Sequence, residues 1–381
     1  MDLRSTPEQE LLRRTVREFA EAEIRPFVMD WDEAQAFPAE LVPRLASIGL
    51  MGIQIPDEFG GAGMSAIEYC ICIEELARVD PSIALSVAAH NGLALAHLSM
   101  FGNDAQREKY VAPLARGETL GAWCLTEAGS GSDAAAMRTS AHRSGGQWVI
   151  NGAKQFITHG KIAGTLVVIA VTDRAEGRRG VSTFVVERGT PGLQAGKKEN
   201  KLGMRASDTS EVIFQDCRVP AEALVGKEGE GFINTLQVLD AGRIGIAALA
   251  VGLAQGAYEA ARRYAHERRQ FGQPIAWFQA IRWKLADMAT RIDAARLLTY
   301  RAAWMRDMRQ ERTSTASSMA KLYSSEIAVR AADECVQIHG GYGFMKDYPA
   351  EKYFRDVKLC TIGEGTSEIQ RLVIARELLG H

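Results

Sequence analysis

Long hydrophobic runs are absent from this 381-residue chain. Its longest uninterrupted apolar stretch, residues 166–171, is far shorter than the roughly 18 residues that a membrane span requires, so we expect no membrane span. The N-terminal residues include Asp2, Glu8 and Glu10 and contain no hydrophobic core segment. This composition argues against a signal peptide and against an acid-poor transit peptide. We therefore expect a cytoplasmic protein whose mature chain starts near Met1.

A strong excess of one charge is also missing. The chain has 45 basic and 47 acidic residues, which gives a formal net charge of -2. A protein without a global positive field does not recruit nucleic acid or an anionic membrane through its overall charge. We expect no nucleic-acid partner, and any site for an anion must be local.

Cysteine is scarce, with six residues, and no Cys-x-x-Cys pair or cysteine–histidine cluster has the spacing of zinc ligands. Cys70 and Cys72 are close together, but they lie in the apolar stretch 67–73. Buried, reduced thiols are the expected outcome for such cysteines. The sequence therefore predicts neither a disulfide framework nor a metal site.

The first part of the chain, residues 1–118, is predicted to be a helical domain. With 46% hydrophobic and 24% charged residues, the composition is that of an ordinary globular protein, and the length suggests two or three domains of roughly 150 residues. Thr6, Pro7 and Gln9 form a strong helix start with a capping box. Apolar residues then recur at helical spacing.

Residues 119–225 contain short β-rich runs between glycine, asparagine and aspartate turns. Strands that follow one another without intervening helices predict a small antiparallel barrel or sandwich. Asn151-Gly152 is a strong hairpin signal, so we expect a turn there. The expected strands are 147–150, 165–172, 182–186 and 211–214.

Residues 226–381 are predicted to be a second helical domain that follows a glycine-rich linker. The fold class expected for the whole chain is α+β, with an antiparallel β-domain between two helical domains. Helices are expected over residues 232–268, 277–308 and 313–338, and a short one after Gly365. Small residues would let the first of these helices approach its neighbours closely: Gly242, Gly245, Ala248, Gly252 and Gly256.

A carboxylate stands between two glycines near the C-terminus. Residues 362–371 read IGEGTSEIQR and lead into a segment with helical periodicity. A carboxylate held in such a loop can act as a base, which makes Glu364 the candidate catalytic residue. The alternative is a surface glutamate that is stabilised by the positive N-terminal end of the following helix.

Two further runs accompany this one: QIHGGYGF at residues 337–344 and WCLTEAGSGSD at residues 123–133. Together the three runs resemble the signatures of the acyl-CoA dehydrogenases, flavoenzymes that desaturate acyl-CoA thioesters. The resemblance extends from the first helix to Leu379 and is strongest to the short-chain and short branched-chain members. It implies an N-terminal helical domain, a middle β-domain and a C-terminal four-helix bundle.

The segment Gly129-x-Gly131-x-x-Ala134 also fits a relaxed dinucleotide fingerprint. However, no βαβ unit surrounds it, and no acidic residue lies about 20 positions further on at the end of a second strand. A Rossmann fold is therefore not expected. The resemblance implies instead that these small residues let backbone and hydroxyl groups approach a flavin.

FAD is the cofactor that the resemblance implies, held first by residues of two β-rich segments. Phe156 would offer a flat aromatic face to the flavin and Thr158 a hydroxyl, although many members have tryptophan at the position of Phe156. Ordinary core residues of a strand are the alternative for this pair. The FAD-binding residues predicted here are Trp123, Leu125, Thr126, Ser132, Phe156 and Thr158.

A second set of cofactor residues is implied to serve a neighbouring subunit. Arg268 and Phe271 follow the long helix, where the helix dipole alone would explain a cation. In the resemblance both reach the flavin of a neighbouring subunit, and Arg268 neutralises its pyrophosphate. The remaining predicted FAD-binding residues are Gln337, Gly341, Thr366 and Glu368. A shared cofactor site requires an oligomer, and we expect a homotetramer.

Asp240 and Arg243 lie three residues apart on the long helix, where a simple ion pair would explain them. The resemblance implies that Arg243 lies beside the catalytic carboxylate and that Asp240 helps to position the CoA arm. Some family members carry their base on this helix, but residues 232–257 contain no glutamate. The base is therefore Glu364 or absent. The predicted substrate-binding residues are Ser132, Asp240, Arg243 and Gly365.

The activity that the resemblance implies is α,β-desaturation of a short-chain or short branched-chain acyl-CoA to trans-2-enoyl-CoA, in fatty acid or branched-chain amino acid degradation. Glu364 would take the α-proton while its N–H and a flavin hydroxyl polarise the thioester oxygen. Electrons would pass to an electron-transfer flavoprotein. The alternatives are a medium-chain enzyme, an acyl-CoA oxidase, which the short chain disfavours, and a flavin-binding paralogue without dehydrogenase activity.

Overall fold

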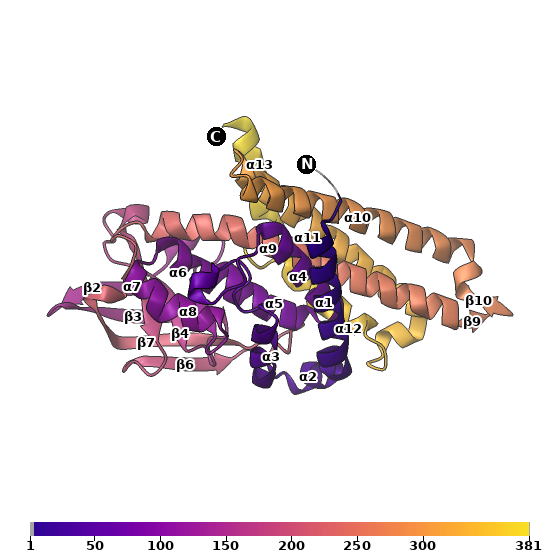
Figure 1. Cartoon of the computed structure of the whole chain (residues 1–381), viewed down its shortest axis with the longest axis horizontal. Coiled ribbons are helices and arrows are strands. Elements are labelled where there is room, and N and C mark those ends of the chain that lie inside the picture. The colour runs from indigo at the N-terminus through magenta and orange to yellow at the C-terminus, as the bar shows by residue number, and fades with distance from the viewer. Residues whose placement is uncertain (1–3, 381) are drawn as a thin grey trace.

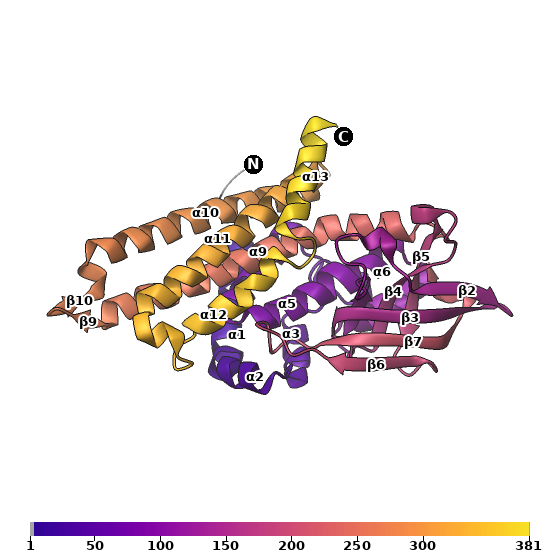
Figure 2. The ribbon, with the colours of Figure 1, turned by 180° about the vertical axis from the view of Figure 1, so that it is seen from behind.

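The computed structural model describes residues 4–380, which form an elongated molecule (Figure 1). A β-sheet occupies one end, the N-terminal helices lie near the middle, and long C-terminal helices extend to the opposite end, as the two views agree (Figures 1 and 2). Helix α9 (Gly231–Glu267) runs from the sheet to the far tip. This architecture of two helical regions and a sheet confirms the predicted α+β fold class.

The N-terminal region begins as the sequence predicts. Helix α1 (Pro7–Glu23) has Thr6 as its N-cap, and the side chains of Thr6 and Gln9 complete a capping box. Helix α4 (Ala66–Val79) is almost completely buried, and all six cysteines of the chain are free and buried. The other helices here are α2 (Val28–Ala34), α3 (Val42–Ser47), α5 (Pro81–Ala89), the π-helix η4 (His90–Leu95), α6 (Ala96–Phe101), α7 (Asp104–Gln106), the π-helix η5 (Arg107–Val111) and α8 (Ala112–Ala115).

The sheet has the strand order β6-β7-β3-β2-β4-β5-β8, and β1 pairs with β4. Most neighbours are antiparallel, but β4 pairs in parallel with β2, and also in parallel with β1, so the sheet is mixed rather than wholly antiparallel. The β2–β3 hairpin lies between β1 and β4 in the chain and provides the long connection that a parallel pair requires. The strands are β1 (Gly121–Cys124), β2 (Ser140–Ser144), β3 (Gln147–Thr158), β4 (Thr165–Val171), β5 (Val181–Glu187), β6 (Leu193–Lys198), β7 (Thr209–Pro220) and β8 (Leu224–Val225).

The hairpin predicted at Asn151-Gly152 is wrong, because β3 continues through both residues. The turn lies at Gly145 and Gly146, whose φ angles of +57° and +79° suit a tight hairpin. Gly152 serves a different purpose. A Cβ atom there would lie 2.5 Å from Oγ1 of Thr139, so the glycine permits a close approach at a shift in the β3–β7 register.

The C-terminal helices agree with the predicted ranges to within a few residues. Helices α9, α10 (Gln279–Asp307) and α11 (Thr313–His339) pack against one another, α12 (Ala350–Asp356) follows, and α13 (Ser367–Leu379) packs on α11 (Figure 2). A small hairpin of β9 (Arg269–Gln270) and β10 (Gln273–Pro274) forms the far tip. A Cβ atom at Gly252 would lie 2.2 Å from the carbonyl oxygen of Glu74, so this glycine lets α9 and α4 pack closely.

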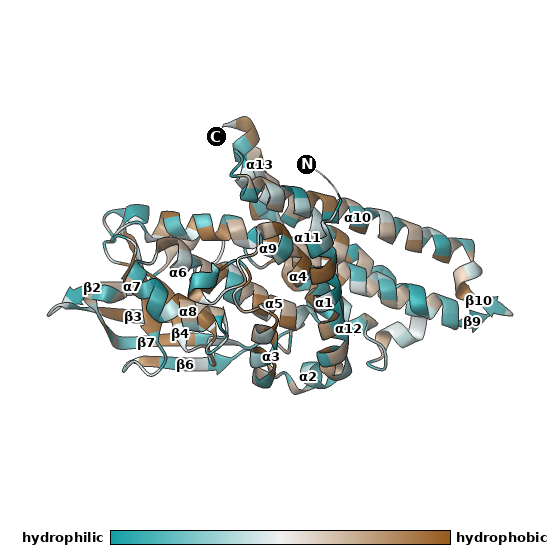
Figure 3. Cartoon of the chain, viewed as in Figure 1, coloured by the Kyte–Doolittle hydropathy of each residue, from teal (hydrophilic) through white to brown (hydrophobic). Residues whose placement is uncertain are grey.

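Two helical stretches of the described chain, Pro81–Phe101 and Gly231–Glu267, are long and apolar enough to cross a membrane by composition alone. Their most apolar windows are 72% and 78% buried inside the protein. Figure 3 shows strongly hydrophobic colour on α4 at the centre of the molecule and polar colour at the β9–β10 tip. The apolar character of both stretches is accounted for by their packing in the protein core.

Candidate active site

Glu364 lies in the loop between the 3-10 helix η11 (Val357–Thr361) and α13, with a φ angle of +53°. A non-glycine residue in this left-handed region is strained, and the surrounding structure must hold it there. Nε2 of Gln370 donates hydrogen bonds to the carbonyl oxygens of Glu364 and Gly365, at 3.2 and 3.0 Å. Nζ of Lys321 donates to the Gly365 carbonyl oxygen at 2.6 Å. Two buried side chains therefore fix the loop.

The carboxylate of Glu364 points inward against α9. Its Oε2 atom is shielded from solvent and has no hydrogen-bond partner within residues 4–380. A Cβ atom at Gly242 would lie only 2.1 Å from this oxygen, so only glycine leaves room for it. Burial raises the pKa of Glu364 to about 7, although the positive charges of Lys321 and Arg243 oppose the rise. Such a group can accept a proton near neutral pH.

The neighbouring walls come from α9 and from the η4–α6 segment. Cδ2 of Leu93 would lie 3.2 Å from the same Cβ position at Gly242. One turn further along, Nδ1 of His97 accepts a hydrogen bond from Nε1 of Trp123 at 3.2 Å. Burial lowers the pKa of His97 to about 3, so its ring is neutral at physiological pH. The η4–α6 segment therefore spans from the carboxylate to Trp123.

A small apolar cluster completes the connection to the sheet. Leu125 is a buried member of this cluster together with Phe232, and Trp123 and Leu239 pack against it. Leu239 precedes Gly242 by one helical turn, roughly 4.5 Å along the axis of α9. The segment predicted to bind the flavin and the predicted base therefore lie in one continuous region of the protein.

The two segments predicted to contact the flavin are tied together by hydrogen bonds. The N–H of Gln155 donates to the carbonyl oxygen of Thr126 at 2.7 Å. The fully buried Lys154 donates from Nζ to the carbonyl oxygen of Leu125 at 2.9 Å and to Oε1 of Glu127 at 2.8 Å. These contacts place residues 125–127 next to the strand that carries Phe156.

Phe156 is not an ordinary core residue of β3, which was the alternative for it. Its side chain is 61% exposed and its φ angle is +59°, at a shift in the β3–β7 register between Lys154 and Ile157. A bulge next to a site can re-aim a side chain. Thr158 is partly buried and pairs with Thr209 on β7. The strand thus presents an open aromatic ring beside Thr126.

The glycines of the predicted flavin segment have no packing role in the chain. A Cβ atom at Gly129 or Gly131 would meet nothing within 4 Å, and Ser132 in the same segment is exposed. Gly341, near the end of α11, is equally open. Together with the exposed ring of Phe156, the open backbone positions at Gly129 and Gly131 fit the approach of a flat, polar cofactor such as a flavin.

Asp240 and Arg243 form the ion pair that was the simple alternative for them. Asp240 also accepts a hydrogen bond from Oγ of Ser314 at 3.0 Å, and Nη1 of Arg243 donates to Oγ of Ser318 at 3.3 Å. Arg243 is buried, and its Nε atom has no partner among the described residues. Its positive charge opposes the rise in the pKa of Glu364 that burial causes. The pair therefore borders the carboxylate as well as bridging α9 to α11.

The remaining predicted cofactor residues fall into two groups. Thr366 is the N-cap of α13 and Glu368 lies in its first turn, close to Glu364 in the chain. Arg268 and Phe271 lie beyond the other end of α9, about 26 residues and roughly 39 Å from Gly242. The second group, at the far end of the C-terminal helices, comprises Arg268, Phe271, Gln337 and Gly341.

Phe271 lies between β9 and β10, the two strands of the hairpin labelled at the far tip in Figure 1. Its side chain is 93% exposed and its φ angle is +50°. The Arg268 guanidinium lies 5.5 Å from the ring centroid of Tyr342, in a cation–π arrangement. A single chain therefore does not bring this group to the sheet.

Several residues that shape the site were not predicted from the sequence. Lys321 and Gln370 hold the loop of Glu364, and Leu93 and His97 form a wall. Only Lys321 left a usable signal, because it shares a helix face with Ser317 and Ala328, which are fully buried. A lysine on such a face is unusual, since lysine is rarely buried without a partner.

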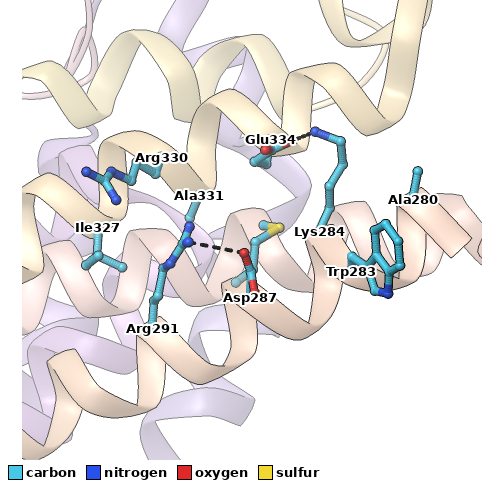
Figure 4. Close-up of a pocket in the computed structure, with 10 residues that line it drawn as sticks. Ala280, Trp283, Lys284, Asp287, Arg291, Ile327, Arg330, Ala331 and Glu334 are labelled. Atoms are coloured by element: carbon cyan, nitrogen blue, oxygen red, sulfur yellow. Dashed lines mark hydrogen bonds and ion pairs between the residues drawn. The ribbon is translucent and has the colours of Figure 1, made fainter.

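A separate groove of about 260 Å³ lies between α10 and α11 (Figure 4). Four of its charged side chains form two ion pairs: Lys284 with Glu334, and Arg291 with Asp287 at 3.1 Å. None of the predicted site residues lines it. The groove is therefore distinct from the site around Glu364.

Three family models match the chain in order. They are "Acyl-CoA dehydrogenase, N-terminal domain" over residues 6–118, "Acyl-CoA dehydrogenase, middle domain" over residues 122–217 and "Acyl-CoA dehydrogenase, C-terminal domain" over residues 229–379. Two curated relatives are each 45% identical to it. A short-chain specific acyl-CoA dehydrogenase of Clostridium acetobutylicum aligns over 99% of this chain and all of its own. An acryloyl-CoA reductase (NADH) of Anaerotignum propionicum aligns over 100% of this chain and 96% of its own.

Solved structures are equally similar. A chain from a structure of the electron transferring flavoprotein of Acidaminococcus fermentans superposes with a TM-score of 0.98 at 44% sequence identity. Butyryl-CoA dehydrogenase of Megasphaera elsdenii superposes with a TM-score of 0.97 at 39% identity. In both comparisons all of each chain is covered. A glutaryl-CoA dehydrogenase of Mycobacterium smegmatis in complex with FADH2 gives 0.94 at 31% identity, over 99% of this chain and 96% of its own. The likeness therefore spans the sheet and both helical regions.

Proposed function

Because the chain belongs to the acyl-CoA dehydrogenase family of flavin-dependent oxidoreductases, we propose that it converts a short-chain or short branched-chain acyl-CoA to trans-2-enoyl-CoA with FAD as cofactor. The observation that carries the proposal is the carboxylate of Glu364, which is buried against Gly242 with an unpartnered oxygen and a pKa raised to about 7. The short-chain substrate is supported by the short-chain specific relative and by the butyryl-CoA dehydrogenase neighbour.

Glu364 supplies two functions to the reaction. The α-proton of a thioester is weakly acidic, so its removal requires a polarised carbonyl in a site that excludes water. The carboxylate takes the proton as the α-C–H bond breaks, and the electron pair of that bond forms the double bond to the β-carbon. The N–H of Glu364 has no acceptor among the described residues, and it is available to the thioester oxygen.

The residues that would hold FAD are those of the two joined β-rich segments, together with Thr366 and Glu368 at the start of α13. Bound FAD supplies the acceptor for the hydride that leaves the β-carbon. Phe156 offers its exposed ring, and the open positions at Gly129 and Gly131 allow the backbone to approach phosphate groups. The side chains that we assign to this role are Trp123, Leu125, Thr126, Ser132, Phe156, Thr158, Thr366 and Glu368.

A second copy of the chain supplies the rest of the cofactor site in this proposal. Arg268, Phe271, Gln337 and Gly341 lie too far from Glu364 to serve the same flavin, which supports a shared site in a homotetramer. An electron-transfer flavoprotein is the proposed electron acceptor, supported by the structural neighbour associated with such a protein. The bacterial relatives support a cytoplasmic location.

The test is an anaerobic assay of the yellow holoenzyme with butyryl-CoA and an artificial electron acceptor. Wild type should bleach and turn over, whereas Glu364→Gln should keep its flavin and oligomeric state and lose at least about 1,000-fold in kcat, because an amide cannot accept the proton. Glu377→Gln, at an exposed carboxylate on α13 that has no role in the site, is the matched control for a change of charge and should retain most of the rate. Substantial turnover by Glu364→Gln would remove Glu364 as the base.

Reduction of a short enoyl-CoA is a second candidate function, because the acryloyl-CoA reductase relative is as similar as the dehydrogenase. The same residues serve both directions, since the proton that Glu364 accepts in desaturation is the one that it returns in reduction. The two are distinguished by adding NADH and acryloyl-CoA to the protein with an electron-transfer flavoprotein. Consumption of NADH that depends on both proteins would favour the reductase.

A further inference from the structure

Lys321 is a buried cation that the mechanism above leaves without a role. It lies on α11 with no exposed surface, and its Nζ atom donates to the carbonyl oxygen of Gly365 at 2.6 Å. Within residues 4–380, no carboxylate accepts a hydrogen bond from it. A buried ammonium group is costly without a paired anion. Two further buried lysines have such partners: Lys154 has Glu127 at 2.8 Å, and Lys352 on α12 has Asp80 at 2.9 Å and Asp356 at 2.6 Å.

The charges around Lys321 come from other elements. From α9, Arg243 faces the same region, but its charge is already paired with Asp240. Burial raises the pKa of Cys360 on η11 to about 12, so this thiol is neutral. The two carboxylates that act on Lys321 are Glu364 and Glu368 of the loop and first turn of α13, and Glu368 is exposed.

We propose that Lys321 is the positioning residue of the base: its Nζ atom anchors the Gly365 carbonyl, and its charge favours the ionised carboxylate of Glu364. The anchor acts on the residue next to Glu364, whose φ angle of +96° is accessible to glycine and which follows the strained φ angle of Glu364 itself. The charge of Lys321 lowers the pKa of Glu364, whereas burial raises it. The inference rests on the proposed function, because it assigns Glu364 as the base.

The experiment measures the pH dependence of kcat for the holoenzyme with butyryl-CoA in wild type, Lys321→Met and Lys321→Arg. Loss of an opposite charge from a buried neighbour shifts a carboxyl pKa upward, so Lys321→Met should move the lower midpoint of the profile up by about one pH unit or more. Lys321→Arg keeps the charge and should restore the midpoint of wild type. Flavin absorbance and melting temperature establish that each variant is loaded and folded.

Ser325→Ala is the matched control, because Oγ of Ser325 donates to the carbonyl oxygen of Cys360 at 2.7 Å, one turn along α11. This substitution removes a buried hydrogen bond to η11, which precedes the loop of Glu364, without removing a charge. The lower midpoint of its pH profile should equal that of wild type. If Lys321→Met does not fold, Lys321→Gln, which keeps a buried donor, carries the same expectation. A midpoint that stays unchanged in the neutral variants, or moves equally in Ser325→Ala, overturns the role of Lys321. An inactive wild type would instead overturn the proposed function.

Discussion

The Oε2 atom of Glu364 occupies the space that a Cβ atom at Gly242 would need, since the two would be 2.1 Å apart. The carboxylate and the long helix are therefore in direct contact, and the helix has no side chain at the point of contact. Gly242, one of several small residues of α9, therefore determines where the carboxylate of Glu364 lies.

Gly242→Ala should therefore displace the base with little cost to the fold. Alanine in a helix interior is favoured over glycine by about 1 kcal/mol, which offsets part of the clash. We expect the variant to bind FAD and to melt within a few degrees of the melting temperature of wild type. Its kcat should fall on the order of 100-fold, because a displacement of about 1 Å in a reacting group has an effect of that size.

Gly252→Ala gives the contrasting result on the same helix. Its Cβ atom would meet the backbone carbonyl oxygen of Glu74 at 2.2 Å, far from Glu364 in the chain. This variant should lose stability and keep the kcat of its folded fraction. Equal kcat in Gly242→Ala and wild type would show that the carboxylate has room to move without loss of function.

The pKa of Glu364 predicts a pH-dependent stability. Burial raises it from 4.5 to about 7, so the folded state binds this proton more tightly than the unfolded state. The stabilisation is fully present below pH 4.5 and is lost as the pH rises through 7. A shift of this size corresponds to roughly 3 kcal/mol. Glu364→Gln does not titrate, so its melting temperature minus that of wild type should increase from pH 5 to pH 8. A constant difference would contradict the raised pKa.

Arg268→Ala should weaken the retention of FAD without changing the base. A lost charge-assisted hydrogen bond corresponds to about 1.5 to 3 kcal/mol, or a roughly 10- to 150-fold higher Kd. Arg262→Ala is the control, because this arginine is exposed on the same helix and lies over Tyr258 at 5.9 Å. Light scattering of the loaded protein checks the shared site, and a flavin-loaded monomer would rule it out.

Substrate size should be visible in a series of saturated acyl-CoAs. Each methylene that enters an apolar pocket contributes about 0.8 kcal/mol, whereas one that meets a closed end of the pocket is rejected. We expect kcat/KM to reach an optimum at butyryl-, isobutyryl- or methylbutyryl-CoA and to fall steeply beyond it. A continued rise through octanoyl-CoA would favour the medium-chain alternative.

The sequence by itself determined the order of the helical and β-rich regions, because local periodicity and capping residues such as Thr6 and Gln9 act within a few positions of the chain. The runs around Trp123 and Glu364 were likewise visible as motifs. The turn predicted at Asn151-Gly152 does not form, because Gly152 lies in close contact with Thr139 and pairs with β7 within a long strand.

Only the tertiary structure decided which of these residues meet. Gly242, Leu93 and Lys321 come from three different elements, and their contacts around Glu364 depend on how α9, η4 and α11 pack rather than on any spacing in the sequence. The same packing separates Arg268 and Phe271 from Glu364 by the length of α9. Burial then set the protonation of the carboxylate, because the loss of water around a charge arises only when distant segments of the chain enclose it.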